Sequence, residues 1–235
     1  MKIGLLECDH VRDELIPIAG DYRQMFPAMF EGVATHWEWF FYDLINGYFP
    51  KHPDECDAYI CTGSRFSVYD DEPWIVQLKT LVQNLYAAKK PFVGVCFGHQ
   101  MLAEALGGKV QKAAVGWCVG VHCFQTSNGN AALQNPRLLM MCKDQVVQLP
   151  PNATVLASSP DCPVAMLQVG DTTLGIQAHP EFSKPYEAAL INLRIEKIGE
   201  QKAQKALESL TQPVDARAMA RYIAQFVEKK YSLNF

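Results

Sequence analysis

Short apolar runs alternate with amphipathic segments along the first half of the chain. Between two of these runs, residues 73–89 carry apolar side chains every three to four positions, and the acidic residues before Pro73 mark a helix start. Alternation of buried strands with helices predicts an α/β fold with a mostly parallel central sheet flanked by helices. The expected strands are Lys2 to Cys8, Trp39 to Leu44, Ala58 to Thr62 and Pro91 to Cys96.

The pattern changes from Gly116 onward, where short strand-like runs are separated by Asn, Gly, Pro and Ser. These runs predict hairpins or a small additional β-sheet packed beside the parallel one. Two helices are expected to close the chain, Pro185 to Gly199 and Val214 to Lys230. Because no repeat or linker interrupts the pattern, we predict a single domain over residues 1–235. The strand-like runs are Cys118 to Gln125, Val146 to Leu149, Thr154 to Ala157, Val164 to Val169 and Thr173 to Ala178.

Composition and charge exclude several classes of protein. With 49% hydrophobic and 20% charged residues, the chain has enough apolar material for one sizeable core. A net charge of −4, without a dense basic cluster, argues against nucleic-acid binding. No apolar run approaches the ~20 residues of a membrane span. The apolar stretch within Met1 to Leu6 is too short for the hydrophobic region of a signal peptide. The eight cysteines contain no C-x-x-C pair. They indicate a protein of the reducing cytoplasm without a disulfide framework.

The most informative stretch is Gly94-Val95-Cys96-Phe97-Gly98, in which a buried strand runs into a helical pattern. This is a nucleophile elbow with Cys in place of Ser. Glycines two residues before and after the nucleophile let strand and helix approach. At a helix start, Cys96 would be stabilised as a thiolate, and the N–H of Phe97 would point toward a developing oxyanion. The elbow therefore predicts acyl transfer through a thioester; the alternative is a buried cysteine in a tight turn.

A thiolate nucleophile needs a base, and the base needs an orienting group. His179 follows a short apolar run and opens the triplet His179-Pro180-Glu181. Because Pro180 favours an extended backbone at His179, the side chains of His179 and Glu181 can lie on the same side of the chain. Glu181 could then hold the imidazole in the tautomer that faces the thiol.

The other five histidines carry weaker signals. His10, His36 and His52 lie in polar contexts and are predicted to be surface residues. His99, three residues after Cys96, is predicted to be a packing residue or to support the site without touching substrate. His122, in an alternating strand, is predicted to be structural or substrate-adjacent.

These motifs resemble those of the class I (triad) glutamine amidotransferases, and the resemblance extends over most of the chain. Gly94 to Gln100 matches the nucleophile block of that family, and Ile176 to Phe182 matches its second block. Tyr59 to Ser64 resembles the loop that supplies the other half of the oxyanion hole. Leu156 to Ser159 and Asp144 to Val146 resemble lesser segments. The resemblance implies a flavodoxin-like fold.

The resemblance also implies residue roles. Cys96 would be the nucleophile, His179 the general base and acid, and Glu181 its orienting carboxylate. The oxyanion donors would be Phe97 together with Gly63 or Ser64, since the family's usual Gly-Gly-Pro or Gly-Pro-Gly is here Gly63-Ser64-Arg65. Gln100 would contact bound glutamine. A histidine that many members carry just before Asp144 is absent here. No metal and no cofactor is expected.

Three readings of function remain open. The first is Cys-dependent hydrolysis of the γ-amide of glutamine, with ammonia passed to a synthetase partner, or of a γ-glutamyl peptide or amine. Because the glutaminase-like segment fills the 235 residues, a stand-alone member resembling the glutaminase of GMP synthase or a γ-glutamyl peptidase is expected. The second is a catalytically silent regulatory or scaffold protein. The third is a zinc site of Cys96, His99, Cys118 and Cys123, although the last two would face opposite sides of a strand.

Overall fold

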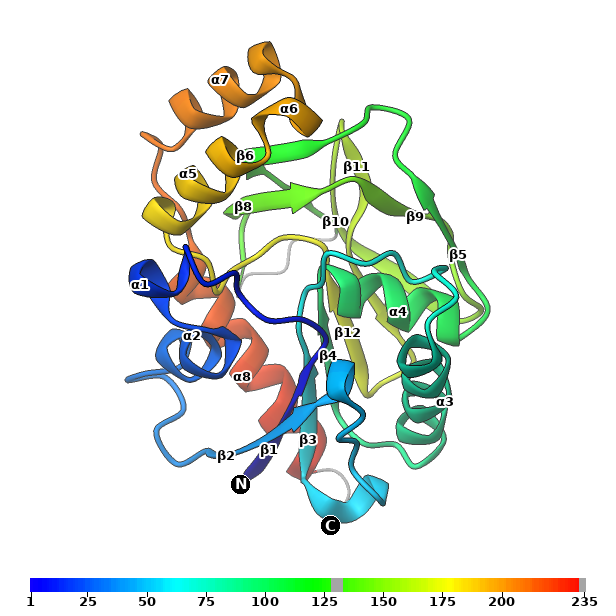
Figure 1. The fold of residues 1–235 in the computed structure, drawn as a ribbon. Coiled ribbons are helices and arrows are strands. Elements are labelled where there is room, and N and C mark those ends of the chain that lie inside the picture. Colours follow the sequence, from blue (N-terminus) through cyan, green and yellow to red (C-terminus); the bar gives the residue numbers. More distant parts are fainter. Residues whose placement is uncertain (128–132, 233–235) are drawn as a thin grey trace.

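The computed structural model describes residues 1–127 and 133–232, and an eight-stranded sheet runs through its centre (Figure 1). The first five strands in the sheet are parallel to their neighbours, and the remaining three are antiparallel. In spatial order the strands are β2 (Glu38–Asp43), β1 (Lys2–Glu7), β3 (Ala58–Cys61), β4 (Phe92–Val95), β12 (Thr173–Ile176), β11 (Cys162–Val169), β10 (Ala153–Ser159) and β7 (Gln125–Thr126).

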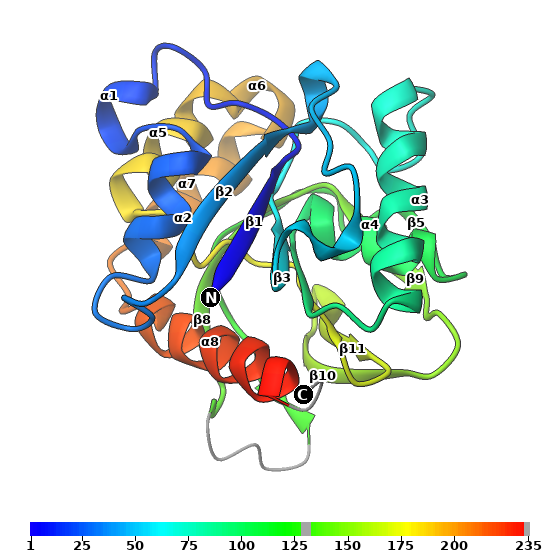
Figure 2. The same ribbon diagram turned by 90° about the horizontal axis from the view of Figure 1, so that it is seen from below.

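Helices cover both faces of this sheet. In Figures 1 and 2, α2 (Tyr22–Met29) and α8 (Ala216–Ser232) lie on one face, and α3 (Pro73–Ala87) and α4 (Phe97–Ala105) lie on the other. The apolar stripe predicted for residues 73–89 is the buried side of α3, from Trp74 to Leu85. β3, β4 and β12 are buried throughout because both of their faces are covered.

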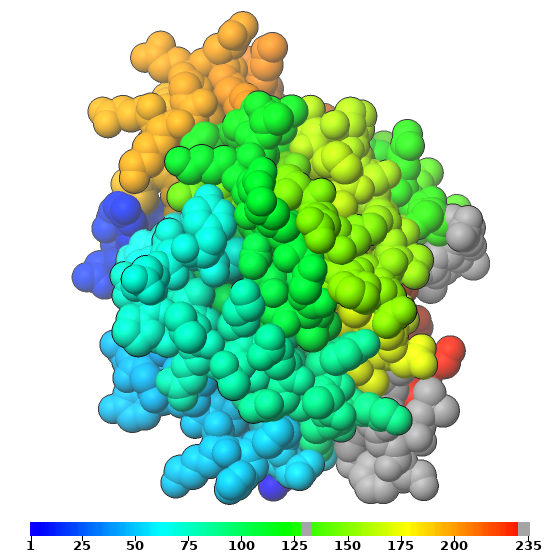
Figure 3. Space-filling view, turned by 90° about the vertical axis from the view of Figure 1, so that its right-hand side faces the viewer, coloured from blue at the N-terminus to red at the C-terminus, as the bar shows by residue number. Residues whose placement is uncertain are grey.

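A second group of elements packs at the carboxyl-terminal end of the parallel strands. Two two-stranded sheets pair β5 (Lys109–Lys112) with β9 (Asp144–Gln148), and β6 (Cys118–Cys123) with β8 (Arg137–Cys142). Figure 3 shows that α6 (Ile195–Ile198) and α7 (Glu200–Ser209), in orange, project beyond the rest of the molecule. The remaining helices are α1 (Ile16–Ala19), α5 (Lys184–Leu193), α6 (Ile195–Ile198) and α7 (Glu200–Ser209), with short 3₁₀ turns at Leu44–Asn46 and Pro53–Glu55.

The predicted α/β fold class is confirmed, with three corrections. The later runs that became β10, β11 and β12 extend the central sheet, because β12 pairs in parallel with β4 over Thr173–Ile176. The helix expected from Pro185 to Gly199 is divided at Arg194. The sequence pattern did not predict five elements, β5, β8, α1, α2 and α7. Pro17 in α1 and Pro27 in α2 argue against a helix in the sequence, and α7 is mostly polar. No helix in the described ranges is long and apolar enough to span a bilayer.

Candidate active site

Cys96 lies at the sharp turn between β4 and α4, with φ 51° and ψ −98°. A Cβ on Gly94 would lie 2.2 Å from the carbonyl oxygen of Gly98, and one on Gly98 would lie 2.6 Å from that of Cys61. Only glycine permits these approaches, because real Cβ atoms do not come so close to backbone atoms. The turn therefore has the geometry of a nucleophile elbow.

His179 is brought to Cys96 by the pairing of β4 with β12. The register Val95↔Ile176 places the two strand ends side by side, so the residues that follow each strand meet at one edge of the sheet. Beyond β12, the backbone N–H of His179 donates to the carbonyl of Leu139 at 2.8 Å. This bond ties the turn that carries His179 to β8.

Glu181 and Phe182 fix the ring of His179. The Nδ1 atom of His179 lies 2.8 Å from Oε1 of Glu181, and both side chains are buried. Phe182 stacks on the imidazole with ring centroids 4.0 Å apart and an interplanar angle of 8°. The carboxylate thus assigns the proton-bearing nitrogen, and the phenyl ring fixes the plane of the imidazole.

The charges around His179 favour its protonated form. Burial of the ring by itself lowers the pKa of His179, but Cys96 and the carboxylate of Glu181 act in the opposite direction and raise the pKa well above its usual value. A neighbouring negative charge stabilises the imidazolium. The surroundings of His179 therefore favour the imidazolium.

The loop after β3 lies directly against Cys96 and His179. A Cβ on Gly63 would lie 2.9 Å from Cε1 of His179 and 3.7 Å from Cβ of Cys96. Within the described chain, the backbone N–H groups of Gly63, Ser64 and Phe97 donate no hydrogen bond to another residue. Backbone donors without protein partners at this position are available to bind a negatively charged oxygen.

Gln100 is buried one helical turn after Cys96 and takes part in an amide network. Its Nε2 donates to the carbonyl of Asp144 at 2.7 Å and to Oε1 of Gln177 at 3.1 Å. Gln177 in turn places Nε2 3.5 Å from Sγ of Cys96. Asp144 accepts through its carboxylate from the hydroxyls of Ser67 and Tyr69. The network connects the thiol to Asp144, which lines the cleft over Cys96.

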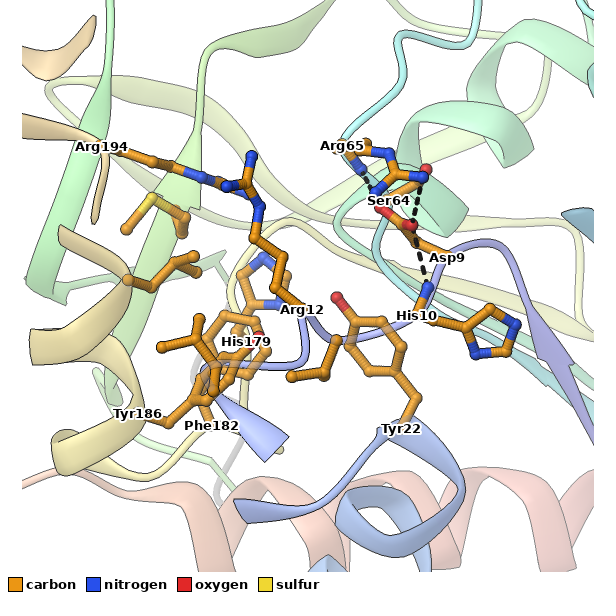
Figure 4. A pocket seen from close by; sticks show the side chains of 14 residues that line it. Asp9, His10, Arg12, Tyr22, Ser64, Arg65, His179, Phe182, Tyr186 and Arg194 are labelled. Carbon is orange, nitrogen blue, oxygen red and sulfur yellow. Dashed lines mark hydrogen bonds and ion pairs between the residues drawn. The ribbon is translucent and has the colours of Figure 1, made fainter. Parts of the chain in front are cut away.

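A cleft of about 660 Å³ opens over Cys96. A smaller cavity over His179 adjoins it, and Figure 4 shows arginines and Tyr22 directed into this cavity. The cleft is lined by Arg12, Ser64, Arg65, Phe66, Asp70, Cys96, Gln100, Trp117, Met141, Cys142, Lys143, Asp144, Leu193, Arg194 and Lys197.

The remaining histidines lie apart from the thiol or are structural. His99 is fully buried against Gly175 of β12, and burial lowers its pKa to about 4, so it packs as a neutral ring. His122 lines a separate hollow beside α7. His36 and His52 are exposed, as predicted. His10, expected at the surface, is partly buried and bridges Asp21 at 2.7 Å and Asp43 at 3.1 Å.

The alternative zinc site does not assemble in the described part of the chain. Cys96, His99, Cys118 and Cys123 form no group of ligand distance there, and Cys123 is exposed on the far end of β6. The ligand atoms that do gather are those of Glu7, His10 and Asp21. Arg23 and Asp43 pair with Glu7 and His10, so this group serves to anchor the loop after β1.

Several residues of the site have no role predicted from the sequence. Gln177 is fully buried in the structure. In the sequence it is a polar residue inside an apolar run, and this pattern could have indicated a buried polar role. Phe182 directly follows the His-Pro-Glu triplet, so its position in the sequence could also have indicated a contact with the imidazole. Arg12 and Arg194 carry no local signal, because their place at the cleft follows from packing of distant segments.

The fold and site together define an α/β protein with a cysteine elbow and a buried histidine–glutamate pair. Residues 57–197 match the family model described as Glutamine amidotransferase class-I. The chain belongs to the class I glutamine amidotransferase family.

Relatives of known name agree with this assignment. Gamma-glutamyl peptidase 3 of Arabidopsis thaliana is 34% identical over 177 residues, covering 70% of each chain. A GMP synthase of Bacteroides fragilis is 31% identical over 138 residues, which cover 57% of this chain and 26% of the synthase. A solved glutamine amidotransferase of Thermotoga maritima superposes with a TM-score of 0.74 at 19% identity, covering 98% of this chain and 97% of that one. The last of these shares the fold.

Proposed function

We propose that this protein hydrolyses the amide bond of a γ-glutamyl substrate, glutamine or a γ-glutamyl peptide, through a thioester on Cys96. The observation that supports it best is the placement of a strained Cys96 beside the buried His179–Glu181 pair at the floor of an open cleft. A buried cysteine in an ordinary tight turn would need neither this pair nor the unpartnered N–H groups next to it.

In the proposed first half-reaction, the Cys96 thiolate attacks the γ-carbonyl carbon. The carbonyl electrons move to oxygen, where the N–H groups of Phe97 and of Gly63 or Ser64 bind the negative charge. His179 then donates its proton to the amide nitrogen, and the C–N bond breaks as the carbonyl reforms. The products are a γ-glutamyl thioester and free ammonia or amine.

In the second half-reaction, His179 removes a proton from water, which attacks the thioester. Collapse of the second tetrahedral intermediate expels the Cys96 thiolate and releases glutamate. Glu181 keeps Nδ1 of His179 protonated in both halves, so Nε2 faces the reacting atoms. Gln177 would place an N–H donor beside the sulfur whenever it is negatively charged.

The matches support this reaction class through the names of the relatives, which are peptidases of γ-glutamyl compounds and a glutamine-hydrolysing synthase. Of the two substrate classes we favour γ-glutamyl peptides. The 660 Å³ cleft is larger than a departing ammonia requires. The peptidase matches also extend over 70% of both chains.

A product assay tests the proposal. Purified protein is incubated separately with glutamine, γ-glutamyl peptides and γ-glutamyl amines, and glutamate, ammonia and amine are quantified. We expect release of glutamate and amine without any added protein, and loss of at least ~10³-fold in kcat for Cys96→Ala with an unchanged melting temperature. Activity of Cys96→Ala above a few per cent would refute the nucleophile. A wild-type protein active only after addition of a synthetase would favour ammonia delivery, and one inactive in every case would favour a silent scaffold.

Active-site labelling gives an independent readout. A glutamine-like diazoketone should alkylate Cys96 alone, because it must be recognised before its electrophile reacts. Cys123 is the control, since it is the exposed one among the eight free cysteines and a general thiol reagent should prefer it. Peptide mass spectrometry showing the diazoketone at Cys123 or elsewhere would contradict the assignment.

A further inference from the structure

We propose that Arg12 and Arg194 form a binding site for a carboxylate on the leaving group. The proposal rests on the proposed function and goes beyond it, because it names the side chains that select the leaving group and the charge they select. Both arginines line the large cleft over Cys96 and the smaller cavity over His179. Figure 4 shows their side chains extending to the same side of that cavity.

The position of the general acid decides where the leaving group lies. His179 has to donate its proton to the amide nitrogen, so the leaving group must begin beside the imidazole. The cavity next to that ring shares five lining residues with the cleft, so the two form one continuous opening. The shared residues are Arg12, Ser64, Arg65, Met141 and Arg194. A leaving group longer than ammonia therefore extends toward the two arginines.

The acidic groups of the cleft do not neutralise these arginines. Asp9 accepts from the backbone N–H of Arg65 at 2.8 Å and lies 3.6 Å from its guanidinium. Asp144 is held by two hydroxyl groups, and Asp70 accepts from a backbone N–H. In the described structure Arg194 forms no ion pair, and Arg12 has a single loose one, 3.7 Å from exposed Glu14. The cleft is thus cationic in a chain whose net charge is −4.

Arg194 is positioned by the break between α5 and α6. It is the residue at which α5 ends and α6 begins, and its backbone N–H donates back to the carbonyl of Ile191 at 3.1 Å. Arg194 is half-buried, and its guanidinium lies over the ring of Trp117, 5.8 Å from the centroid. Stacking on an aromatic face leaves the guanidinium edge available for a carboxylate.

Arg12 is carried by a loop that is anchored on both sides. His10 bridges Asp21 and Asp43, and the N–H of Val11 donates to Asp21 at 2.9 Å. On the other side, the carboxylate of Asp9 accepts a hydrogen bond from the backbone N–H of Arg65, in the loop after β3. These contacts hold the backbone of the loop before a ligand binds, which lowers the entropy lost on binding.

A guanidinium fork binds a carboxylate through two parallel hydrogen bonds. The substrates that fit are therefore γ-glutamyl amino acids or peptides with a free carboxylate, in preference to γ-glutamyl amines. We expect kcat/KM for γ-glutamylalanine to exceed that for its C-terminal carboxamide by about tenfold or more, the size of one charge-assisted hydrogen bond. The two compounds have the same scissile bond and the same bulk.

The test compares this acid-to-amide ratio across variants. In Arg194→Met and Arg12→Met the ratio should fall toward one, while Arg194→Lys, which keeps the charge but loses the fork, should retain part of the preference. Arg221→Met, at an exposed arginine of α8 away from the cleft, is the matched control and should keep the wild-type ratio. The preference should also weaken as salt is raised.

Binding to Cys96→Ser, measured by calorimetry, separates this proposal from the proposed function. If that variant binds the acid about tenfold more tightly than the carboxamide, and Arg194→Met removes the difference, the carboxylate site is supported even if the wild type hydrolyses nothing. Equal affinity for the two compounds would overturn the site even if hydrolysis is rapid. A ratio unchanged in both arginine variants, with circular dichroism showing a native fold, would also overturn it.

Discussion

Cys96 combines two properties that rarely coincide, a positive φ and a side chain larger than hydrogen. Such a backbone costs about 1–3 kcal/mol and persists only where its surroundings hold it. Here both backbone groups are bonded, the N–H to the carbonyl of Ile176 at 2.8 Å and the carbonyl to the N–H of Gln100 at 3.0 Å. The strain therefore directs the thiol toward the cleft while the main chain remains satisfied.

Glu181 and His179 should differ in how much their loss costs. We expect His179→Ala to lower kcat by ~10³-fold or more, and Glu181→Gln to cost ten- to a hundredfold less, because the amide keeps the shape of the pair. Steady-state kinetics on the favoured substrate measures both. Equal losses would mean that Glu181 has another role.

The pH profile of Glu181→Gln gives a second test of the same pair. Burial lowers the pKa of His179, while Cys96 and Glu181 raise it, so removing one of the two negative charges should lower the pKa of the imidazolium. The alkaline limb of the kcat/KM profile, which reports loss of that proton, should move to lower pH. A limb that stays in place, or moves up, would contradict the pairing inferred from the 2.8 Å contact.

At the scale of elements, the site depends on how closely α4 approaches β4. Gly94 should be sensitive to any side chain, because the Cβ of Ala would meet backbone atoms of Gly98 at 2.2 Å. We expect Gly94→Ala to lower the free energy of unfolding by about 3 kcal/mol or more and to abolish activity. Urea unfolding measures the first effect and the product assay the second.

Gly47 is the matched control for this substitution. It has φ +84°, and no atom lies within 4 Å of the position that a Cβ would take, so Ala there meets the backbone penalty alone, about 1–2 kcal/mol. The active site should be unaffected, because Gly47 follows the 3₁₀ turn after β2. If Gly94→Ala were as stable and as active as Gly47→Ala, the close approach would not matter for the elbow.

At the scale of the whole molecule, a buried carboxyl group on α5 links this helix to the two-stranded sheet of β6 and β8. Glu187 of α5 accepts from the N–H of Gly120 on β6 at 3.2 Å, and its other oxygen has no partner among the described residues. A Cβ on Gly120 would lie 2.5 Å from Oγ of Ser209 on α7. Burial raises the pKa of Glu187 to about 8 from its usual 4.5.

This shift predicts how stability depends on pH. Between about pH 4.5 and 8 the unfolded chain releases the Glu187 proton while the folded chain retains it. The contribution of Glu187 to stability is therefore complete below pH 4.5 and decreases as pH rises to about 8, with a slope of at most about 1.4 kcal/mol per pH unit. Glu187→Gln should flatten the dependence and stabilise the protein above pH 8. Denaturant unfolding across this range measures it.

Glu196→Gln, at an exposed glutamate of α6, is the control for that experiment. It should leave the wild-type pH dependence in place. A Glu187→Gln variant that keeps the wild-type slope would show that Glu187 is ionised in the folded protein.

The sequence by itself determined the features that rest on neighbouring residues. Buried strands are apolar whichever strands they pair with, so β1, β3 and β4 were visible as runs. The elbow was visible because its glycines lie within two positions of Cys96. His179 and Glu181 are two positions apart, and an extended backbone places such side chains on one side. The expected pair is present in the structure.

Only the tertiary structure decided which distant segments meet. β12 lies between β4 and β11, which brings His179 to Cys96 across 83 positions of the 235-residue chain. That pairing depends on register and on packing against both faces of the sheet, and neither leaves a local mark in the sequence. The same holds for Arg12 and Arg194, because a charged residue at the end of a helix or in a loop looks the same whether it faces solvent or a shared cleft.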